Sequence, residues 1–175
     1  MNLDTISIKD FAVKAYALWG IRWLLLTAGD FNKGDFNTMT VGWGGFGAMW
    51  NMPIALVASR PSRYTTEFME RYQDFTLTAF PHKYHSALTL LGTKSGRDGD
   101  KISEAGLTPI ASERVASPGF AEADLIVECK TIYKQDLDPA SFIDPSIERM
   151  YGGYNYHRMY YGEVILVRGT EKYSA

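Results

Sequence analysis

The chain has 175 residues, of which 46% are hydrophobic and 22% are charged, and its formal net charge is −2. This composition excludes a disordered protein, and the slight acidic excess excludes a strongly basic nucleic-acid-binding domain. The single cysteine excludes a disulfide framework and a four-thiolate metal site. Four tryptophans, eleven tyrosines and nine phenylalanines exceed the needs of a small core, as is typical of a groove for a flat ligand or a subunit interface. The length predicts a single domain over residues 1–175.

One segment has the length of a membrane span. Residues 36–59 contain no charged side chain. Their glycines, a proline and several amide and hydroxyl side chains oppose a membrane helix. The first residues contain neither a basic region nor an apolar region of the kind that a signal peptide requires. We therefore expect buried strands in a cytoplasmic protein that does not enter a membrane.

Short apolar or alternating runs predict six strands. In residues 37–43, Thr38 and Thr40 alternate with Met39 and Val41, which predicts a strand with two different faces. Pro53 opens a later run, where a strand tolerates proline. The predicted strands cover residues 21–29, 37–43, 53–59, 75–80, 125–133 and 156–167.

Helices are predicted in several connections. One covers residues 65–71, with Ser62 or Thr65 as its cap, and a second runs from Pro81 to a stop at Gly92. Shorter helices are expected before Gly106 and within the long excursion over 136–153. Because strands and helices do not alternate steadily, the pattern favours a mainly β, α+β barrel over a doubly wound parallel sheet.

Some motifs carry no function on closer reading. Residues 42–47 match G-x-G-x-x-G, but Pro53 and a strand follow where a phosphate-binding helix would have to begin, so we predict a tight strand connection. His82 and His85 could face one metal, but no third ligand is near, so we expect solvent-facing imidazoles and no metal site. Cys129 is predicted to be a buried apolar side chain.

Four polar sites remain. They are residues 37–40 with Trp43, residues 59–65, residues 93–97 with Lys101, and His157. The second and third concentrate the cations Arg60, Arg63, Lys94, Arg97 and Lys101. Arginines and hydroxyls near a helix start suit a phosphate monoester. A solvated basic loop explains the same residues equally well on composition alone.

The same residues carry a family resemblance. Asn-Thr-Met-Thr-x-Gly-Trp at 37–43, Arg-Pro-Ser-Arg-Tyr-Thr at 60–65 and Lys-Ser-Gly-Arg-Asp at 94–98 stand in order along the chain. Asp-Lys at 100–101, Gly-Leu-Thr-Pro at 106–109, Tyr-His at 156–157 and Tyr-Gly-Glu-Val at 161–164 extend the set. From about residue 23 to 167, the chain resembles the flavin reductase-like FMN-binding split barrels, in particular the flavoredoxin branch.

The resemblance implies a fold, an assembly and a site. The fold would be a six-stranded antiparallel Greek-key split barrel, forming a homodimer with one FMN per subunit at the interface. One group of residues would line the ring of the cofactor: Asn37, Thr38, Met39, Thr40 and Trp43. A second would hold the phosphate and ribityl chain or close the site: Ser59, Arg60, Ser62, Arg63, Thr65, Lys94, Ser95 and Lys101. His157 would lie near the ring as the catalytic residue, and in protonated form would favour the reduced ring.

One departure from the family pattern concerns the electron donor. Many flavin reductases have Gly-Asp before the histidine that seats the nicotinamide, whereas this chain has Asn155 and Tyr156 before His157. If residues 156–167 form a strand, Tyr156 points to the face opposite His157. We therefore predict that NAD(P)H is a poor direct reductant. A core histidine remains the alternative interpretation of His157.

The function that follows is an FMN-dependent oxidoreductase passing electrons from a reductant to a small acceptor or a redox protein partner. One alternative is a flavin-binding electron carrier without its own NAD(P)H turnover. Another is a barrel that binds no flavin and serves as a binding module. The residues do not identify the physiological donor or acceptor.

Overall fold

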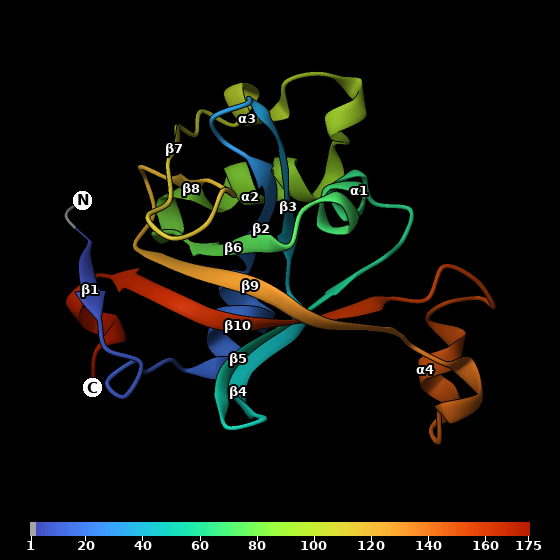
Figure 1. The fold of residues 1–175 in the computed structure, drawn as a ribbon. Coiled ribbons are helices and arrows are strands. Elements are labelled where there is room, and N and C mark those ends of the chain that lie inside the picture. Colours follow the sequence, from blue (N-terminus) through green and yellow to red (C-terminus); the bar gives the residue numbers. More distant parts are fainter. Residues whose placement is uncertain (1–2) are drawn as a thin grey trace.

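The computed structural model describes residues 3–175, and an antiparallel sheet dominates it (Figure 1). Its strands follow the order β3-β2-β6-β9-β10-β5-β4, and β1 pairs with β10 as well. The bounds are β1 Asp4–Ile6, β2 Leu24–Asp30, β3 Asp35–Val41, β4 Gly44–Met49, β5 Met52–Ser59, β6 Asp74–Ala79, β9 Leu125–Asp136 and β10 Arg158–Gly169. A separate hairpin joins β7, Pro109–Ile110, to β8, Gly119–Phe120.

The sheet is curled, which brings segments distant in its strand order together. After β3 ends, the backbone N–H of Ala58 in β5 donates to the carbonyl of Trp43 at 3.0 Å. The end of β3 therefore meets the end of β5, although four strands separate them in the order of the sheet. This confirms the predicted mainly β barrel with short helices in its connections, with more strands than the six expected.

The six predicted strands are all present, with bounds that differ by up to three residues. The strand expected from residue 21 begins at Leu24, because residues 17–22 form a turn of π-helix and Trp23 has a positive φ of 62°. The last strand begins at Arg158, so Tyr156 and His157 precede it. The glycine-rich residues after β3 form β4, which pairs with β5 and is followed by no helix.

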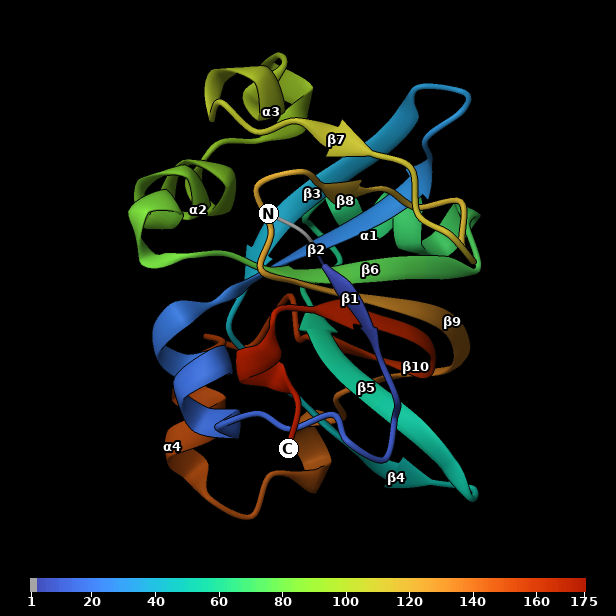
Figure 2. The same cartoon turned by 90° about the vertical axis from the view of Figure 1, so that its left-hand side faces the viewer.

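Four α-helices lie in the connections: α1 Tyr64–Arg71, α2 His85–Thr93, α3 Lys101–Glu104 and α4 Pro145–Arg149. Helix α2 passes through Gly92 instead of stopping there. The predicted caps of α1 are wrong, since its N-cap is Arg63 and no side chain caps it. Figure 2 shows α2 and α3 together on one side of the molecule and α4 on the other, in the excursion between β9 and β10.

Two apolar clusters pack against the sheet. In β2, Leu24 and Leu26 belong to one cluster and Leu25 to the other, as alternation requires of a strand buried on both faces. Phe68 of α1 joins the first cluster, and Leu91 of α2 joins the second. The two helices are thereby fixed against β2 and β3, and they hold the loops that follow β5 and α2.

The uncharged segment over 36–59 forms β3, β4 and β5. Within residues 3–175, no helix is long and apolar enough to cross a membrane. Cys129 is fully buried as a free thiol in β9, as predicted. Burial raises its pKa well above the ordinary thiol value.

Candidate functional site

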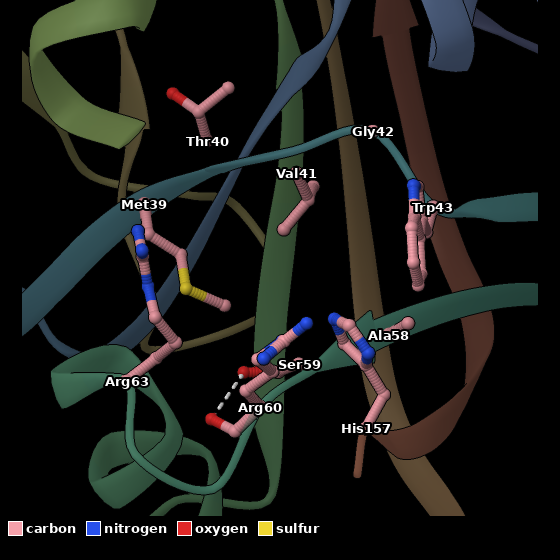
Figure 3. Close-up of a pocket in the computed structure, with 10 residues that line it drawn as sticks. All are labelled: Met39, Thr40, Val41, Gly42, Trp43, Ala58, Ser59, Arg60, Arg63 and His157. Carbon is pink, nitrogen blue, oxygen red and sulfur yellow. Dashed lines mark hydrogen bonds between the residues drawn. The ribbon is translucent and has the colours of Figure 1, made fainter. Parts of the chain in front are cut away.

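Two adjoining cavities lie where β3, β5 and α1 meet. The first has a volume of about 220 Å³ and is lined by Met39, Thr40, Val41, Gly42, Trp43, Ala58, Ser59, Arg60, Arg63 and His157 (Figure 3). The second measures about 140 Å³ and is lined by Asn37, Met39, Ser62, Arg63, Tyr64, Thr65, Thr93, Lys94, Ser95, Gly96, Arg97 and Lys101. Because Met39 and Arg63 line both, the two cavities share a wall and together make up one candidate site. It gathers every predicted site residue except Thr38.

Several predicted hydroxyls are already engaged within the protein. Thr38 is fully buried, and its Oγ1 lies 2.8 Å from Oγ1 of Thr27. The Oγ1 of Thr40 donates to the Leu88 carbonyl at 2.5 Å, and Figure 3 shows this side chain pointing away from the others. Ser59 is hydrogen-bonded to Thr66. These three residues shape the site, and their side-chain hydroxyls are not free for a ligand.

Asn37 ties the site to α1. Its Nδ2 donates to Oγ1 of Thr65 at 2.7 Å, and both side chains are buried. Thr65 does not cap α1, because the helix already begins at Tyr64 and Thr65 lies within its first turn. The bond connects β3 to the first turn of the helix, next to the loop that contains Ser62 and Arg63.

Three cations of the site have no carboxylate partner within residues 3–175: Arg60, Arg63 and Lys101. The Nη2 of Arg63 donates to the Gly92 carbonyl at 2.7 Å. The Nζ of Lys101 donates to the carbonyls of Leu91 and Lys94, at 3.0 and 3.1 Å. No aspartate or glutamate lines either cavity.

Burial and the mutual repulsion of these cations lower the pKa values of Lys101 and Arg63. Lys101 is only 3% exposed, and burial, assisted by the charge of Arg63, lowers its pKa to about 8. Burial and the charge of Arg60 lower the pKa of Arg63 as well. Like charges gathered in a partly buried site become favourable when an anion binds between them. The two remaining cations of the second cavity are neutralised by acids outside it, in the ion pairs Lys94–Glu104 and Arg97–Glu67.

The loop over 93–101 approaches β3 closely. A Cβ on Gly96 would lie 2.3 Å from Oδ1 of Asn37, closer than any side chain could pack. Ser95 stabilises the following turn, since its Oγ accepts from the backbone N–H of Arg97 at 3.2 Å. The absence of a side chain at Gly96 therefore sets the width of the second cavity.

Aromatic rings form the wall of the first cavity. Trp43 is 46% exposed, and its ring lies 4.6 Å from that of His157, at 38°. Nδ1 of His157 is 2.9 Å from the hydroxyl of Tyr151. Burial, with the charge of Arg60, lowers the pKa of His157 to about 4. With its pKa at about 4, the imidazole of His157 is neutral at pH 7 in the ligand-free protein.

The segment before β10 differs from its expected geometry. Tyr156 and His157 do not alternate across a strand, because both precede it. The Tyr156 hydroxyl donates to Oε1 of Glu148 at 2.5 Å, and Tyr156 lines neither cavity. Asn155 has a positive φ of 55°, and its Nδ2 donates to Oγ of Ser62 at 2.8 Å. Asn155 thus holds the loop that follows β5.

A family model described as the flavin reductase-like domain matches residues 23–173. The chain belongs to this family. A comparison with curated proteins gave no match.

Among solved structures, the fold of this flavin reductase-like chain is similar to that of three proteins. Flavoredoxin of Desulfovibrio vulgaris (Miyazaki F) is 21% identical with a TM-score of 0.67, covering 91% of this chain and 73% of that one. Flavoredoxin from Methanosarcina acetivorans is 20% identical, with a TM-score of 0.68 and coverage of 97% and 74%. The FMN-binding domain of a flavin reductases-like enzyme from Shewanella baltica is 19% identical, with a TM-score of 0.69 and coverage of 96% and 77%.

Some residues of this site could not be predicted from the sequence. Tyr64 and Gly96 line the second cavity, and Tyr151 supports His157 from behind. Arg97 belongs to the basic cluster seen in the sequence but was not among the predicted site residues. Its guanidinium lies 4.7 Å from the Tyr64 ring centroid. Tyr151 had no signal, because it stands outside every motif.

Of the motifs set aside in the sequence analysis, the glycine-rich segment meets the site through Gly42 and Trp43, whereas His82, His85 and Cys129 line neither cavity. Residues 3–175 contain no group of three or more His, Cys, Asp or Glu side chains able to hold a metal. His82 is exposed as expected, but His85 is partly buried, with its ring 4.6 Å from that of Trp23. The glycines after β3 pack tightly, since a Cβ on Gly44 would lie 2.2 Å from the Leu56 carbonyl oxygen.

Proposed function

We propose that the chain binds FMN across the two cavities and acts as an FMN-dependent oxidoreductase. The observation that carries the proposal is the set of unpaired cations at a cavity that no acid lines. Arg60, Arg63 and Lys101 together require a strongly anionic ligand, and a phosphate monoester supplies two negative charges. The family membership makes a flavin the natural carrier of that phosphate.

The second cavity would hold the phosphate and the ribityl chain. Arg63 offers a forked donor, and Lys101 offers the remaining hydrogen of its ammonium group. Helix α1 begins at Tyr64 without a side-chain cap, so its first N–H groups add positive potential. Ser62, Thr65, Lys94 and Ser95 would complete the polar wall.

The first cavity would hold the flavin ring, which supplies the redox chemistry when FMN is bound. Trp43 and His157 offer an aromatic wall with a polar edge, and Met39 offers a polarisable apolar contact. The backbone from Met39 to Gly42 borders the same space. In this division Thr40 would lie near the ring through its backbone, whereas Thr38 lines neither cavity.

The proposal includes a homodimer whose second copy completes the ring site. Tyr133 of β9, Tyr161 of β10 and Trp50 in the turn between β4 and β5 form a surface cluster, with ring centroids 5.3 to 6.0 Å apart. Trp50 is 51% exposed and Tyr133 is 42% exposed. Exposed aromatic clusters of this kind suit a subunit interface.

We treat residues 1–175 as one FMN-binding unit in the cytoplasm. The lining residues are drawn from Asn37 to His157, and the family model extends over 23–173. A free, buried Cys129 suits a reducing compartment.

One observation favours the second candidate, an electron carrier without its own NAD(P)H turnover. The ring of His157 is already occupied by Trp43 on its face and by Tyr151 at Nδ1. Little of this imidazole is left to seat a nicotinamide. We therefore expect a small acceptor or a redox protein, instead of NAD(P)H, to exchange electrons rapidly with the site.

Stopped-flow reduction of the FMN-loaded protein separates the two candidates. Dithionite should bleach the bound flavin, whereas NADH and NADPH should reduce it far more slowly than the ~10 per second usual for enzymes. Steady-state NADH oxidation, with and without added free flavin, is the companion assay. Rapid reduction by NADH would establish a flavin reductase and reject the carrier.

A further inference from the structure

Tyr151 supports the site without lining it. Its side chain is 4% exposed, and its hydroxyl lies 2.9 Å from Nδ1 of His157. Within residues 3–175, Nδ1 of His157 is the only acceptor near the hydrogen of this hydroxyl, because the other group beside it, the backbone N–H of His157, can only donate. The position of the hydrogen between Tyr151 and Nδ1 therefore decides whether Nε2 of His157 carries a hydrogen or a lone pair.

The excursion between β9 and β10 holds Tyr151 firmly. Its ring stacks on Phe142 at 5.8 Å and 10°, and it packs against Tyr156 at 5.0 Å. The guanidinium of Arg60 lies 5.2 Å from the Tyr151 ring centroid. The base of the excursion is closed where the backbone N–H of Leu137 donates to the carbonyl of His157 at 2.9 Å. These contacts leave the hydroxyl little freedom to turn elsewhere.

A neutral imidazole carries one hydrogen, so the pair has two arrangements. If Nδ1 carries the hydrogen, it donates to the phenol oxygen, and the buried phenol hydrogen is left without an acceptor. An unpaired buried donor costs about 1–3 kcal/mol. If the phenol donates to a bare Nδ1, every hydrogen of the pair is used and the imidazole hydrogen lies on Nε2.

We propose that Tyr151 is a positioning residue that holds His157 as the tautomer with its hydrogen on Nε2, so that His157 offers an N–H donor to the ligand. The inference rests on the proposed function, because the ligand in question is the flavin ring or an acceptor stacked on it. The low pKa of His157 keeps the ring neutral, so that this tautomer persists across the physiological range. In this state His157 donates a hydrogen bond and does not act as a general base.

A donor fixed in this way favours the more electron-rich state of whatever it contacts. For a bound flavin, that state is the reduced one. Tyr151 therefore acts on the ratio of affinities for reduced and oxidised flavin, through the orientation of His157. A residue with a merely structural role would change both affinities together.

The tautomer can be measured in flavin-free protein. The chain has three histidines, so nitrogen NMR of the imidazoles gives few signals, and His157→Gln assigns the relevant one. Wild type should show hydrogen on Nε2 and a bare Nδ1. Tyr151→Phe should mix the two tautomers, and Tyr156→Phe, which removes a neighbouring hydroxyl bonded to Glu148, should not. A wild-type signal with hydrogen on Nδ1 would overturn the proposal.

The second measurement compares the dissociation constants of reduced and oxidised FMN. Tyr151→Phe should weaken reduced FMN by about two- to tenfold relative to oxidised FMN, which is the effect of one hydrogen bond. Tyr156→Phe should leave the ratio unchanged. An unchanged ratio in Tyr151→Phe would contradict the proposal. If FMN failed to bind, the proposed function would be rejected, while the NMR result would still decide the tautomer.

Discussion

At the scale of single residues, Lys101 links ligand binding to pH. Its pKa of about 8 in the ligand-free protein means that the side chain loses its proton above that pH. A phosphate dianion beside it would raise the pKa, so FMN binding above pH 8 must take up a proton. We expect the FMN affinity to fall as pH rises from 8 to 9.5, by at most about tenfold per unit for one proton.

Titrations with FMN at several pH values test this dependence. Lys101→Met should bind FMN more weakly and should show a flatter profile above pH 8. Lys83→Met, which removes a lysine that lines neither cavity, should keep the wild-type slope. A wild-type profile that is flat between pH 7 and 9.5 would contradict the role given to Lys101.

The residue types at the site were predictable, but their partners were not. The sequence places Thr65 and Ser62 at a helix start, where capping is the ordinary role. In the folded chain Thr65 bonds to Asn37, and Ser62 bonds to Asn155, 93 residues away. Pairings at such separations follow from the curl of the sheet, which no local pattern encodes.

At the scale of elements, the loop over 93–101 sets the width of the phosphate end. Gly96→Ala would bring a methyl group against Asn37, so the loop or β3 has to shift. We expect FMN affinity to fall by about tenfold or more, equivalent to about 1.4 kcal/mol, with riboflavin affected less because it has no phosphate. Fluorescence titration with both ligands measures the difference.

Gly45→Ala is the matched control for Gly96→Ala. A Cβ at Gly45 in β4 would meet no atom within 4 Å, and the residue lines neither cavity. Its FMN affinity should equal that of wild type. If Gly96→Ala bound FMN as tightly as Gly45→Ala, the close approach to Asn37 would not define the site.

The presence of the strands was predicted more accurately than the residues at which they begin and end. Alternation identified β3 and β6, and the apolar runs identified β2 and β9, because burial acts along a whole strand. The start of β2 was placed too early, because Ile21 and Arg22 end a turn of π-helix and Trp23 has a positive φ. Ile21 is 60% exposed, so an apolar residue next to a buried strand need not belong to it. The start of β10 was also placed too early, because Asn155 reverses the chain at a positive φ.

At the scale of the whole molecule, the proposed homodimer predicts that assembly and ring binding are coupled. The surface cluster around Trp50 is the proposed contact, so Trp50→Glu should place a charge in it and produce monomers. Light scattering coupled to size exclusion measures the mass of the 19.7 kDa chain in solution. Wild type should give twice the chain mass.

The Trp50→Glu variant also reports on the cofactor. Trp50 lines neither cavity, so a loss of FMN affinity in a folded monomer would follow from the missing second copy. Ile143→Glu, at a fully exposed position in the excursion, is the control and should remain dimeric. A monomeric wild type that binds FMN tightly would reject the interface.

The arrangement of the four polar sites was the largest gap between sequence and structure. Composition left a phosphate site and a solvated loop equally plausible, because charge along a chain does not show which cations lack partners. The fold decides that Lys94 and Arg97 are paired with acids, whereas Arg63 and Lys101 face a cavity without one. From the sequence, only the family resemblance links the four sites to one ligand.

The central claim is that the unpaired cations bind the phosphate of FMN, and titration of flavin-free protein with FMN and riboflavin tests it most directly. Wild type should bind FMN more tightly than riboflavin. Arg63→Ala should weaken FMN by about ten- to a hundredfold, the effect of about 1.5–3 kcal/mol for a hydrogen bond to a charged group, and should leave riboflavin nearly unchanged. Arg149→Ala, in α4 and outside both cavities, should change neither. Equal affinities for FMN and riboflavin in wild type, or equal losses in Arg63→Ala, would contradict the account.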